Sequence, residues 1–131
     1  MKNTIFKLTE HVYYFSLLVL LILYLFPGSL IGYLLYGNLG QQPNLISNPI
    51  GTSINHLIFF SYITILAMTV RLRTKNILTN YRFTLFISCV LEISHLIIPN
   101  RAFELNDLLA NFTGVVIIIL INSFLKWRKY F

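Results

Sequence analysis

Long apolar runs separated by short polar stretches dominate this chain of 131 residues. Four runs are long enough to be helices, at residues of about 12–36, 54–70, 83–98 and 107–125. A helix needs roughly 20 residues, and usually about 17 to 25, to cross a bilayer. The pattern therefore predicts one all-α domain over residues 1–131, a bundle of four transmembrane helices. Pro27 and Gly28 predict either an end or a kink in the first helix, because proline lacks an amide donor.

The distribution of charge predicts the orientation of these helices. The chain has 10 Lys and Arg against 4 Asp and Glu, is only 11% charged and has a mean hydropathy of +0.73, which is too apolar for a soluble domain. Every basic residue except Arg101 falls on one side of a four-span chain: Lys2, Lys7, Arg71, Arg73, Lys75, Arg82, Lys126, Arg128 and Lys129. By the positive-inside rule, both termini are predicted to be cytoplasmic. Membrane lipids, and not nucleic acid, are the partners that this pattern indicates.

Polar and charged residues gather where the second, third and fourth predicted helices reach the outer face. The set is His56, Glu92, His95, Arg101, Glu104, Asp107 and Asn111. Glu92 and His95 are three residues apart, and Asp107 and Asn111 are four apart, so each pair shares one helix face. Charge beside a hydrocarbon layer is costly and usually serves a purpose. We therefore take these seven residues as the candidate functional cluster.

Three interpretations of this cluster stay open at the level of sequence. In a structural one, Asn106 or Asp107 caps the last helix, Glu92 pairs with Arg101 or His95, and hydrogen bonds hold the helices together. In a functional one, Arg101 binds a phosphate or carboxylate, and the acidic and imidazole groups orient the ligand or move protons. A metal is the weakest interpretation, because Glu-x-x-His is common by chance. We accordingly predict no metal and no cofactor, and the lone Cys89 permits no intramolecular disulfide.

The spacing of these residues resembles the VanZ-like family of small bacterial membrane proteins. In that family an acidic residue on the third helix precedes a proline, an arginine, an aromatic–acidic pair, an aspartate, an asparagine and a glycine. The matching positions here are Glu92, Pro99, Arg101, Phe103, Glu104, Asp107, Asn111 and Gly114. The segment from Asn55 to Phe60 also resembles the start of the family's second helix. Two positions depart from the pattern, since His95 stands where glutamine is usual and Asn55 where a charged residue is frequent.

The resemblance implies a role in the cell envelope and a place in the bacterial cytoplasmic membrane, with N-in/C-in topology. The family's name comes from an association with resistance to a glycopeptide antibiotic. We expect the cluster to bind or act on an anionic lipid or wall-precursor headgroup. The alternative is a non-catalytic accessory subunit that stabilises a larger membrane complex. Whether the chain catalyses a reaction stays open, and a transporter is less favoured because no internal repeat or discontinuous helix pair is evident.

Overall fold

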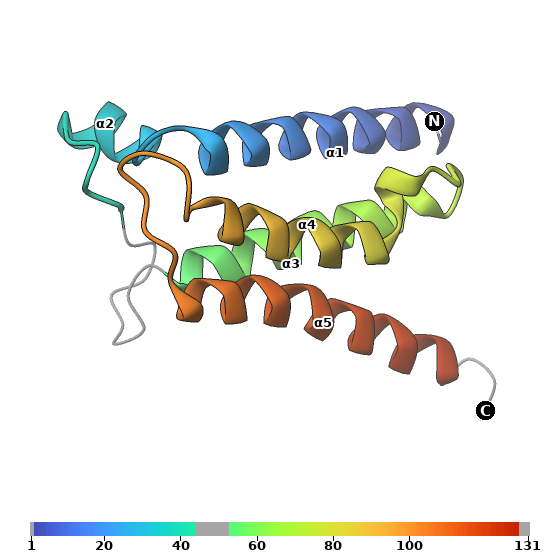
Figure 1. Cartoon of the computed structure of the whole chain (residues 1–131). Coiled ribbons are helices and arrows are strands. Elements are labelled where there is room, and N and C mark those ends of the chain that lie inside the picture. Colours follow the sequence, from blue (N-terminus) through green and yellow to red (C-terminus); the bar gives the residue numbers. More distant parts are fainter. Residues whose placement is uncertain (1, 44–52, 129–131) are drawn as a thin grey trace.

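The computed structural model describes residues 2–43 and 53–128, and these residues form helices joined by short turns (Figure 1). In chain order the helices are α1 (Lys2–Leu25), α2 (Leu30–Tyr36), α3 (Ser53–Arg71), the 3-10 helix η1 (Ile77–Thr79), α4 (Tyr81–Ser94) and α5 (Leu105–Trp127). Within the described ranges there is no β-strand. The all-α prediction is confirmed. Three segments are long and apolar enough to cross a membrane, which supports a membrane protein: Thr4–Leu25, Ser53–Arg71 and Leu105–Trp127.

The first predicted helix is broken at Pro27, which the sequence had left undecided. Helix α1 ends at Leu25, and Gly28 takes a φ of +91°, a value that favours glycine. Ser29 then starts α2, and its hydroxyl accepts a hydrogen bond from the amide of Gly32. Helix α1 also begins earlier than predicted, at Lys2 instead of residue 12. The residues before the apolar run are more polar but are helical as well, so the run marked only part of the helix.

The third predicted helix, at residues 83–98, is shorter in the structure. Helix α4 begins at Tyr81, after Asn80 accepts a hydrogen bond from the Arg82 amide, and it ends at Ser94. Turns closed by hydrogen bonds between residues three apart follow, and helical geometry is disfavoured for the residue before Pro99. At 1.5 Å per residue, the 14 residues of α4 span only about 21 Å, less than the roughly 30 Å of a hydrocarbon core. By length, three helices qualify as spans, and the fourth predicted span is not confirmed.

Helix α3 lies at the centre of the bundle and packs against α1, α4 and α5 (Figure 1). Helices α3 and α5 extend one or two residues beyond the predicted ranges of 54–70 and 107–125, a difference usual for helix ends. The buried apolar side chains repeat at helical spacing on facing sides: Tyr13, Leu17, Leu20, Tyr24, Phe60, Ile63, Ala67, Val70, Ile87, Leu91 and Val115. This spacing gives each helix one core-facing side.

The contact between α3 and α5 depends on Gly114. A Cβ atom at this position would lie 2.5 Å from the carbonyl oxygen of Leu57, closer than real Cβ contacts allow. The Ser61 hydroxyl donates to the Gly114 carbonyl at 3.2 Å across the same contact. A small residue at a helix crossing lets two backbones approach closely. This approach holds the N-terminal halves of α3 and α5 together and so positions the polar residues that they carry.

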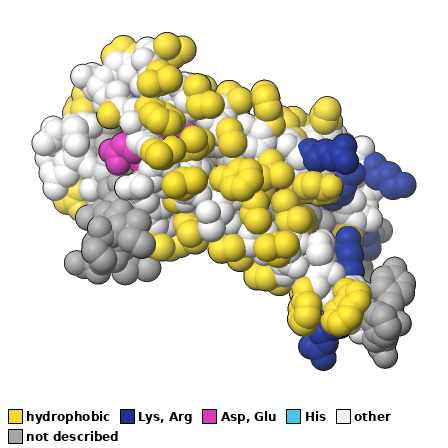
Figure 2. All heavy atoms as spheres, turned by 60° about the horizontal axis from the view of Figure 1, so that its bottom comes forward, with side chains coloured by type: hydrophobic (Ala, Val, Ile, Leu, Met, Phe, Trp, Pro, Cys, Tyr) yellow, Lys and Arg dark blue, Asp and Glu magenta, His cyan; other side chains and the backbone are white. Residues whose placement is uncertain are grey.

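Charged side chains are divided between the two ends of the bundle. Lys and Arg side chains gather at the end where both chain termini lie, and Asp and Glu side chains show at the opposite end (Figures 1 and 2). Of the predicted basic set, Lys129 lies outside the described residues, as does the side chain of Lys2. The described part of the chain therefore has one basic end and one end that carries the polar cluster.

Candidate functional site

Six of the seven predicted cluster residues meet at the end of the bundle opposite the termini. They come from α3, from α4 and its C-cap, from the following loop and from α5: His56, Glu92, His95, Arg101, Asp107 and Asn111. Glu92 and Asn111 are fully buried, and His95 and Asp107 nearly so. The side chain of Glu104 is exposed outside this group, and only its amide takes part, as a donor to Glu92 at 3.3 Å. Separate helices and the loop before α5 thus bring these residues together at one end of the bundle.

Tyr24, which the sequence analysis did not select, lies at the centre of the cluster. Its hydroxyl donates to Oδ1 of Asn111 at 2.8 Å and lies 2.5 Å from Nδ1 of His56. Its ring stacks on the His95 imidazole, with centroids 5.4 Å apart. The sequence contains only a weak indication that Tyr24 belongs to the cluster. Tyr24 continues the helical spacing of the buried residues on α1 and carries a hydroxyl into an apolar run, where a partner is required.

The hydrogen bonds around Tyr24 assign the protons of His56. The amide nitrogen of Asn111 donates to the carbonyl of Ser88 at 3.3 Å, so its Oδ1 must face Tyr24. The single hydroxyl proton of Tyr24 goes to that oxygen, so Nδ1 of His56 is the donor toward Tyr24. In a neutral imidazole the other nitrogen then carries a lone pair. That nitrogen, Nε2, lies 3.3 Å from Oδ2 of Asp107.

Glu92 is held on one side only. Its Oε1 lies 3.2 Å from Nδ1 of His95 and accepts from the Glu104 amide, while Nε2 of His95 lies 3.2 Å from the carbonyl of Tyr24. Both imidazole nitrogens thus face oxygen acceptors, one on Glu92 and one on the backbone of Tyr24. The second oxygen, Oε2, is buried, has no hydrogen-bond partner among the described residues and lies 4.0 Å from Nδ1 of His56. One fully buried carboxylate oxygen is therefore left without a donor.

Asp107 faces the cluster instead of capping α5. The N-cap is Glu104, which makes no side-chain capping bond, so a capping role for Asn106 or Asp107 is wrong. Oδ1 of Asp107 accepts a hydrogen bond from the Ser53 hydroxyl at 2.5 Å, a partner that the sequence did not indicate. Asp107 still lies in the first turn of α5, where the helix dipole favours a negative charge.

Arg101 closes the broken end of α1. Its Nη2 donates to the carbonyl of Leu23 at 2.5 Å, and its Nε donates to the carbonyl of Phe26 at 3.3 Å. In a continuous helix the Leu23 carbonyl would accept from residue 27, but Pro27 has no amide proton. The sequence analysis took Arg101 as an anion-binding group or as a partner of Glu92. No ion pair of Arg101 occurs within the parts of the chain that the structure describes.

The electrostatic setting of Arg101 keeps it a cation. Burial lowers the pKa of its guanidinium, whereas Tyr24, Glu92 and Asp107 raise it. Since the ordinary value is far above neutrality, the group stays charged near pH 7. A guanidinium has five N–H donors, and two of them serve the α1 carbonyls.

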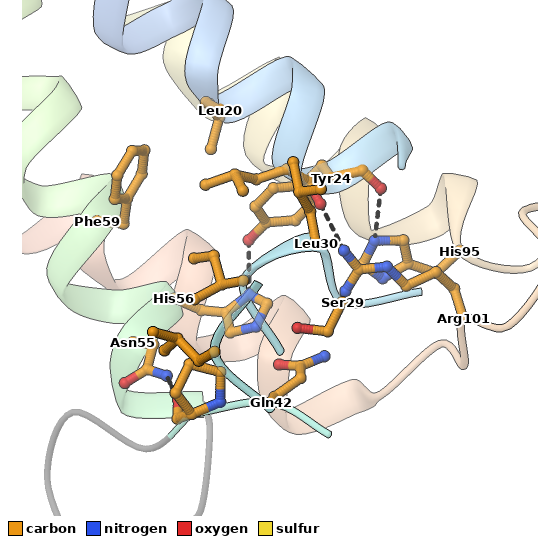
Figure 3. A pocket seen from close by; sticks show the side chains of 14 residues that line it. Leu20, Tyr24, Ser29, Leu30, Gln42, Asn55, His56, Phe59, His95 and Arg101 are labelled. Atoms are coloured by element: carbon orange, nitrogen blue, oxygen red, sulfur yellow. Dashed lines mark hydrogen bonds between the residues drawn. The ribbon is translucent and has the colours of Figure 1, made fainter. Parts of the chain in front are cut away.

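Two cavities adjoin the cluster. The larger, of about 330 Å³, lies between α1, α2 and α3, with mostly apolar walls and a polar end that includes Tyr24, His56, His95 and Arg101 (Figure 3). A smaller, polar cavity of about 160 Å³ is lined by Arg101, His95 and Asp107 and by the loops after α2 and α4. Arg101 and His95 line both cavities. The cluster is thus buried within the protein, yet two cavities reach its edges.

Three residues of the cluster also have the spacing of metal ligands. His56, Glu92 and Asp107 come from three different helices, and each offers a ligand atom within 4.8 Å of the others. The sequence analysis gave metal the least weight because a Glu-x-x-His pair is common by chance. In the structure the possible ligands are Glu92, His56 and Asp107, and His95 of the Glu-x-x-His pair is not among them. His95 contacts Oε1 of Glu92, whereas His56 lies near Oε2 of Glu92 and Oδ2 of Asp107.

No protein-family model, curated protein or solved structure matches this chain. The resemblance to the VanZ-like family therefore stays a prediction.

Proposed function

We propose that this chain is a VanZ-like membrane protein of the bacterial cell envelope that binds the anionic headgroup of a lipid or lipid-linked wall precursor. The cavity between α1, α2 and α3 carries the proposal, because it combines apolar walls with a cationic, hydrogen-bonding end. Its volume of about 330 Å³ is in the usual range of ligand pockets. An acyl or prenyl chain suits the apolar walls, and a phosphate suits the polar end.

The polar end of the cavity offers donors to an anion. Arg101 is charged, lines the cavity and has N–H groups beyond the two that cap α1. A planar guanidinium suits phosphate or carboxylate oxygens. The Ser29 hydroxyl lies at the same end, and so does His95, although both of its nitrogens already face acceptors of the protein (Figure 3). These groups support recognition of a negative headgroup and do not by themselves indicate a reaction.

The distribution of charge supports a topology with both termini in the cytoplasm. Basic side chains gather at the end with the termini, so the cluster and the cavity lie toward the outer leaflet (Figure 2). A fourth span needs more than α4 alone. Helix η1 precedes it, and the exposed apolar side chains of Leu96 and Ile97 follow it, so both can lengthen the segment within the membrane. This topology places the cavity beside outer-leaflet headgroups and wall precursors.

Filling the cavity tests the proposal. Leu35 lines it and is 62% exposed, whereas its neighbour Leu34 is 73% exposed and does not line it. We expect Leu35→Trp to reduce the retention of phosphatidylglycerol severalfold, because the larger ring occupies space that the acyl chain needs. Leu34→Trp is the matched control, since it adds the same ring at a similarly exposed position and should retain lipid as the wild type does. Retained lipid per chain is measured by native mass spectrometry after incubation with phosphatidylglycerol and detergent washing.

Equal lipid retention in Leu35→Trp and wild type would contradict binding in this cavity. That result would favour the alternative, a non-catalytic accessory subunit in a larger membrane complex. Helix α5 favours it, because it exposes large apolar side chains along its length, including Leu109, Phe112, Leu120 and Phe124. A partner subunit covers such a surface as well as lipid does. In that case the cluster serves mainly to hold the helices together.

A further inference from the structure

We propose that His56, Glu92 and Asp107 form a binding site for a divalent metal ion, and that Zn²⁺ is the ion their ligand set fits best. One imidazole and two carboxylates are established ligand types for Zn²⁺. Each residue comes from a different helix, α3, α4 or α5, so an ion here would hold three helices together. Such an ion binds with or without a lipid in the neighbouring cavity.

Three acceptor atoms converge at this place. Nε2 of His56 carries a lone pair, because Nδ1 uses its proton toward Tyr24. That lone pair faces Oδ2 of Asp107 at 3.3 Å, and two acceptors at this distance require a positive species between them. Oε2 of Glu92 is the third, fully buried and without a hydrogen-bond partner among the described side chains. A buried carboxylate oxygen left without a donor is costly, and a metal ion supplies what it lacks.

The separations match a zinc site. Zn²⁺ lies about 2.0–2.2 Å from nitrogen and oxygen ligands, which spaces the ligands of a tetrahedral site about 3.3–3.6 Å apart. The 3.3 Å between His56 and Asp107 is already at this value. Glu92 is the more distant ligand: the three ligand atoms lie within 4.8 Å of one another, and Oε2 of Glu92 lies 4.0 Å from Nδ1 of His56, so binding requires this carboxylate to move toward Nε2. The protein therefore supplies three ligands and leaves a fourth position for water or another ligand.

Hydrogen bonds to the remaining polar atom of each ligand residue orient the ligands, as such bonds do in known metal sites. A ligating histidine usually donates its other N–H to a fixed acceptor, and Nδ1 of His56 has Tyr24 and Asn111 for this purpose. Ser53 donates to the second oxygen of Asp107. His95 and the Glu104 amide hold the second oxygen of Glu92. Each ligand thus has its other polar atom occupied and one atom directed inward.

The polar cavity gives an ion access to this site. It is lined by Asp107 itself and by Asn100 and Glu104 of the loop before α5. The lining includes two carboxylates as well as the cationic Arg101, so it is polar and can admit a hydrated ion, whereas the larger cavity is mainly apolar. Metal and lipid would therefore approach the cluster through different openings.

Zinc content tests the proposal directly. The full chain, purified in detergent and stripped with a chelator, is incubated with Zn²⁺, passed over a desalting column and analysed by inductively coupled plasma mass spectrometry. We expect one Zn²⁺ per wild-type chain and a higher thermal unfolding midpoint with Zn²⁺ than without. Glu92→Gln removes a ligand charge and should weaken binding by more than about tenfold. Glu10→Gln is the matched control, since Glu10 lies near Thr74 at the opposite end and should bind as the wild type does.

A second variant keeps the test decisive if Glu92→Gln fails to fold. Ser53→Ala leaves all three ligands and removes only the donor to Asp107, so we expect about 10- to 100-fold weaker Zn²⁺ binding in a folded protein. A wild-type chain without stoichiometric Zn²⁺ overturns the proposal, and a proton then bridges His56 and Asp107. Equal Zn²⁺ affinity in wild type and Ser53→Ala, or equal loss in Glu10→Gln, also overturns it, because the ion would bind elsewhere.

Discussion

Asn111→Ala is expected to lower the free energy of unfolding by about 2–4 kcal/mol. The side chain is fully buried on α5, accepts from Tyr24 of α1 and donates to the Ser88 carbonyl of α4. Its truncation leaves the Tyr24 hydroxyl without its acceptor, which costs roughly 1–3 kcal/mol for a buried group, and the lost bond to the Ser88 carbonyl adds about 1 kcal/mol. The measurement is SDS-induced loss of helical circular dichroism in mixed micelles.

Asn122→Ala is the control for this effect. Asn122 lies on the same helix but is only half-buried, so the same truncation should change stability by no more than about 0.5 kcal/mol. Equal effects of the two substitutions would show that Asn111 does not tie the helices together. The assignment of protons to Tyr24 and His56 would then be unsupported, because it depends on the orientation of the Asn111 amide.

Arg101→Met is expected to destabilise the protein by about 1–3 kcal/mol. The apolar side chain keeps much of the stem but removes the donors to the carbonyls of Leu23 and Phe26, where Pro27 interrupts the helix. The free energy of unfolding is measured in the same micelles. Because these carbonyls lie at the break between α1 and α2, we also expect faster amide hydrogen exchange in residues 30–36.

Two comparison variants separate the guanidinium from the charge. Arg101→Lys keeps the cation but offers a single ammonium, so it should recover only part of the lost stability. Arg82→Met removes a basic residue that is exposed in the first turn of α4, away from the cluster, and should have little effect. If Arg101→Met were as stable as Arg82→Met, Arg101 would not serve as the cap of α1.

The apolar runs predicted most of the helices because burial of an apolar face decides where helices form in such a chain. Two local features escaped this reasoning. The first turns of α1 are polar, so hydropathy did not mark them. The segment at residues 96–98 is apolar but not helical, because Pro99 disfavours helix before it and the C-terminal carbonyls of α4 accept hydrogen bonds in tight turns. Hydropathy reports how strongly each residue type prefers an apolar environment, and it does not detect such backbone constraints.

The site was predictable where residues carried a charge, an imidazole or an amide, and was missed where they carried only a hydroxyl. Spacing brought Glu92, Asp107 and Asn111 into the candidate cluster because a charge or amide in an apolar run is conspicuous. Tyr24 and Ser53 were missed, because tyrosine and serine are common in membrane helices and only their partners show their importance. The capping of α1 by Arg101 depends on a contact between residues far apart in the chain, which no local pattern contains.

The composition of the native particle tests the central claim most directly. The chain is extracted from its own membrane in mild detergent through a small tag, and its intact mass is measured together with the lipids that remain bound. The account predicts particles that contain only this chain and about one anionic lipid per chain. Particles with stoichiometric larger subunits and no bound anionic lipid would contradict it, and the polar cluster would then serve assembly in place of ligand binding.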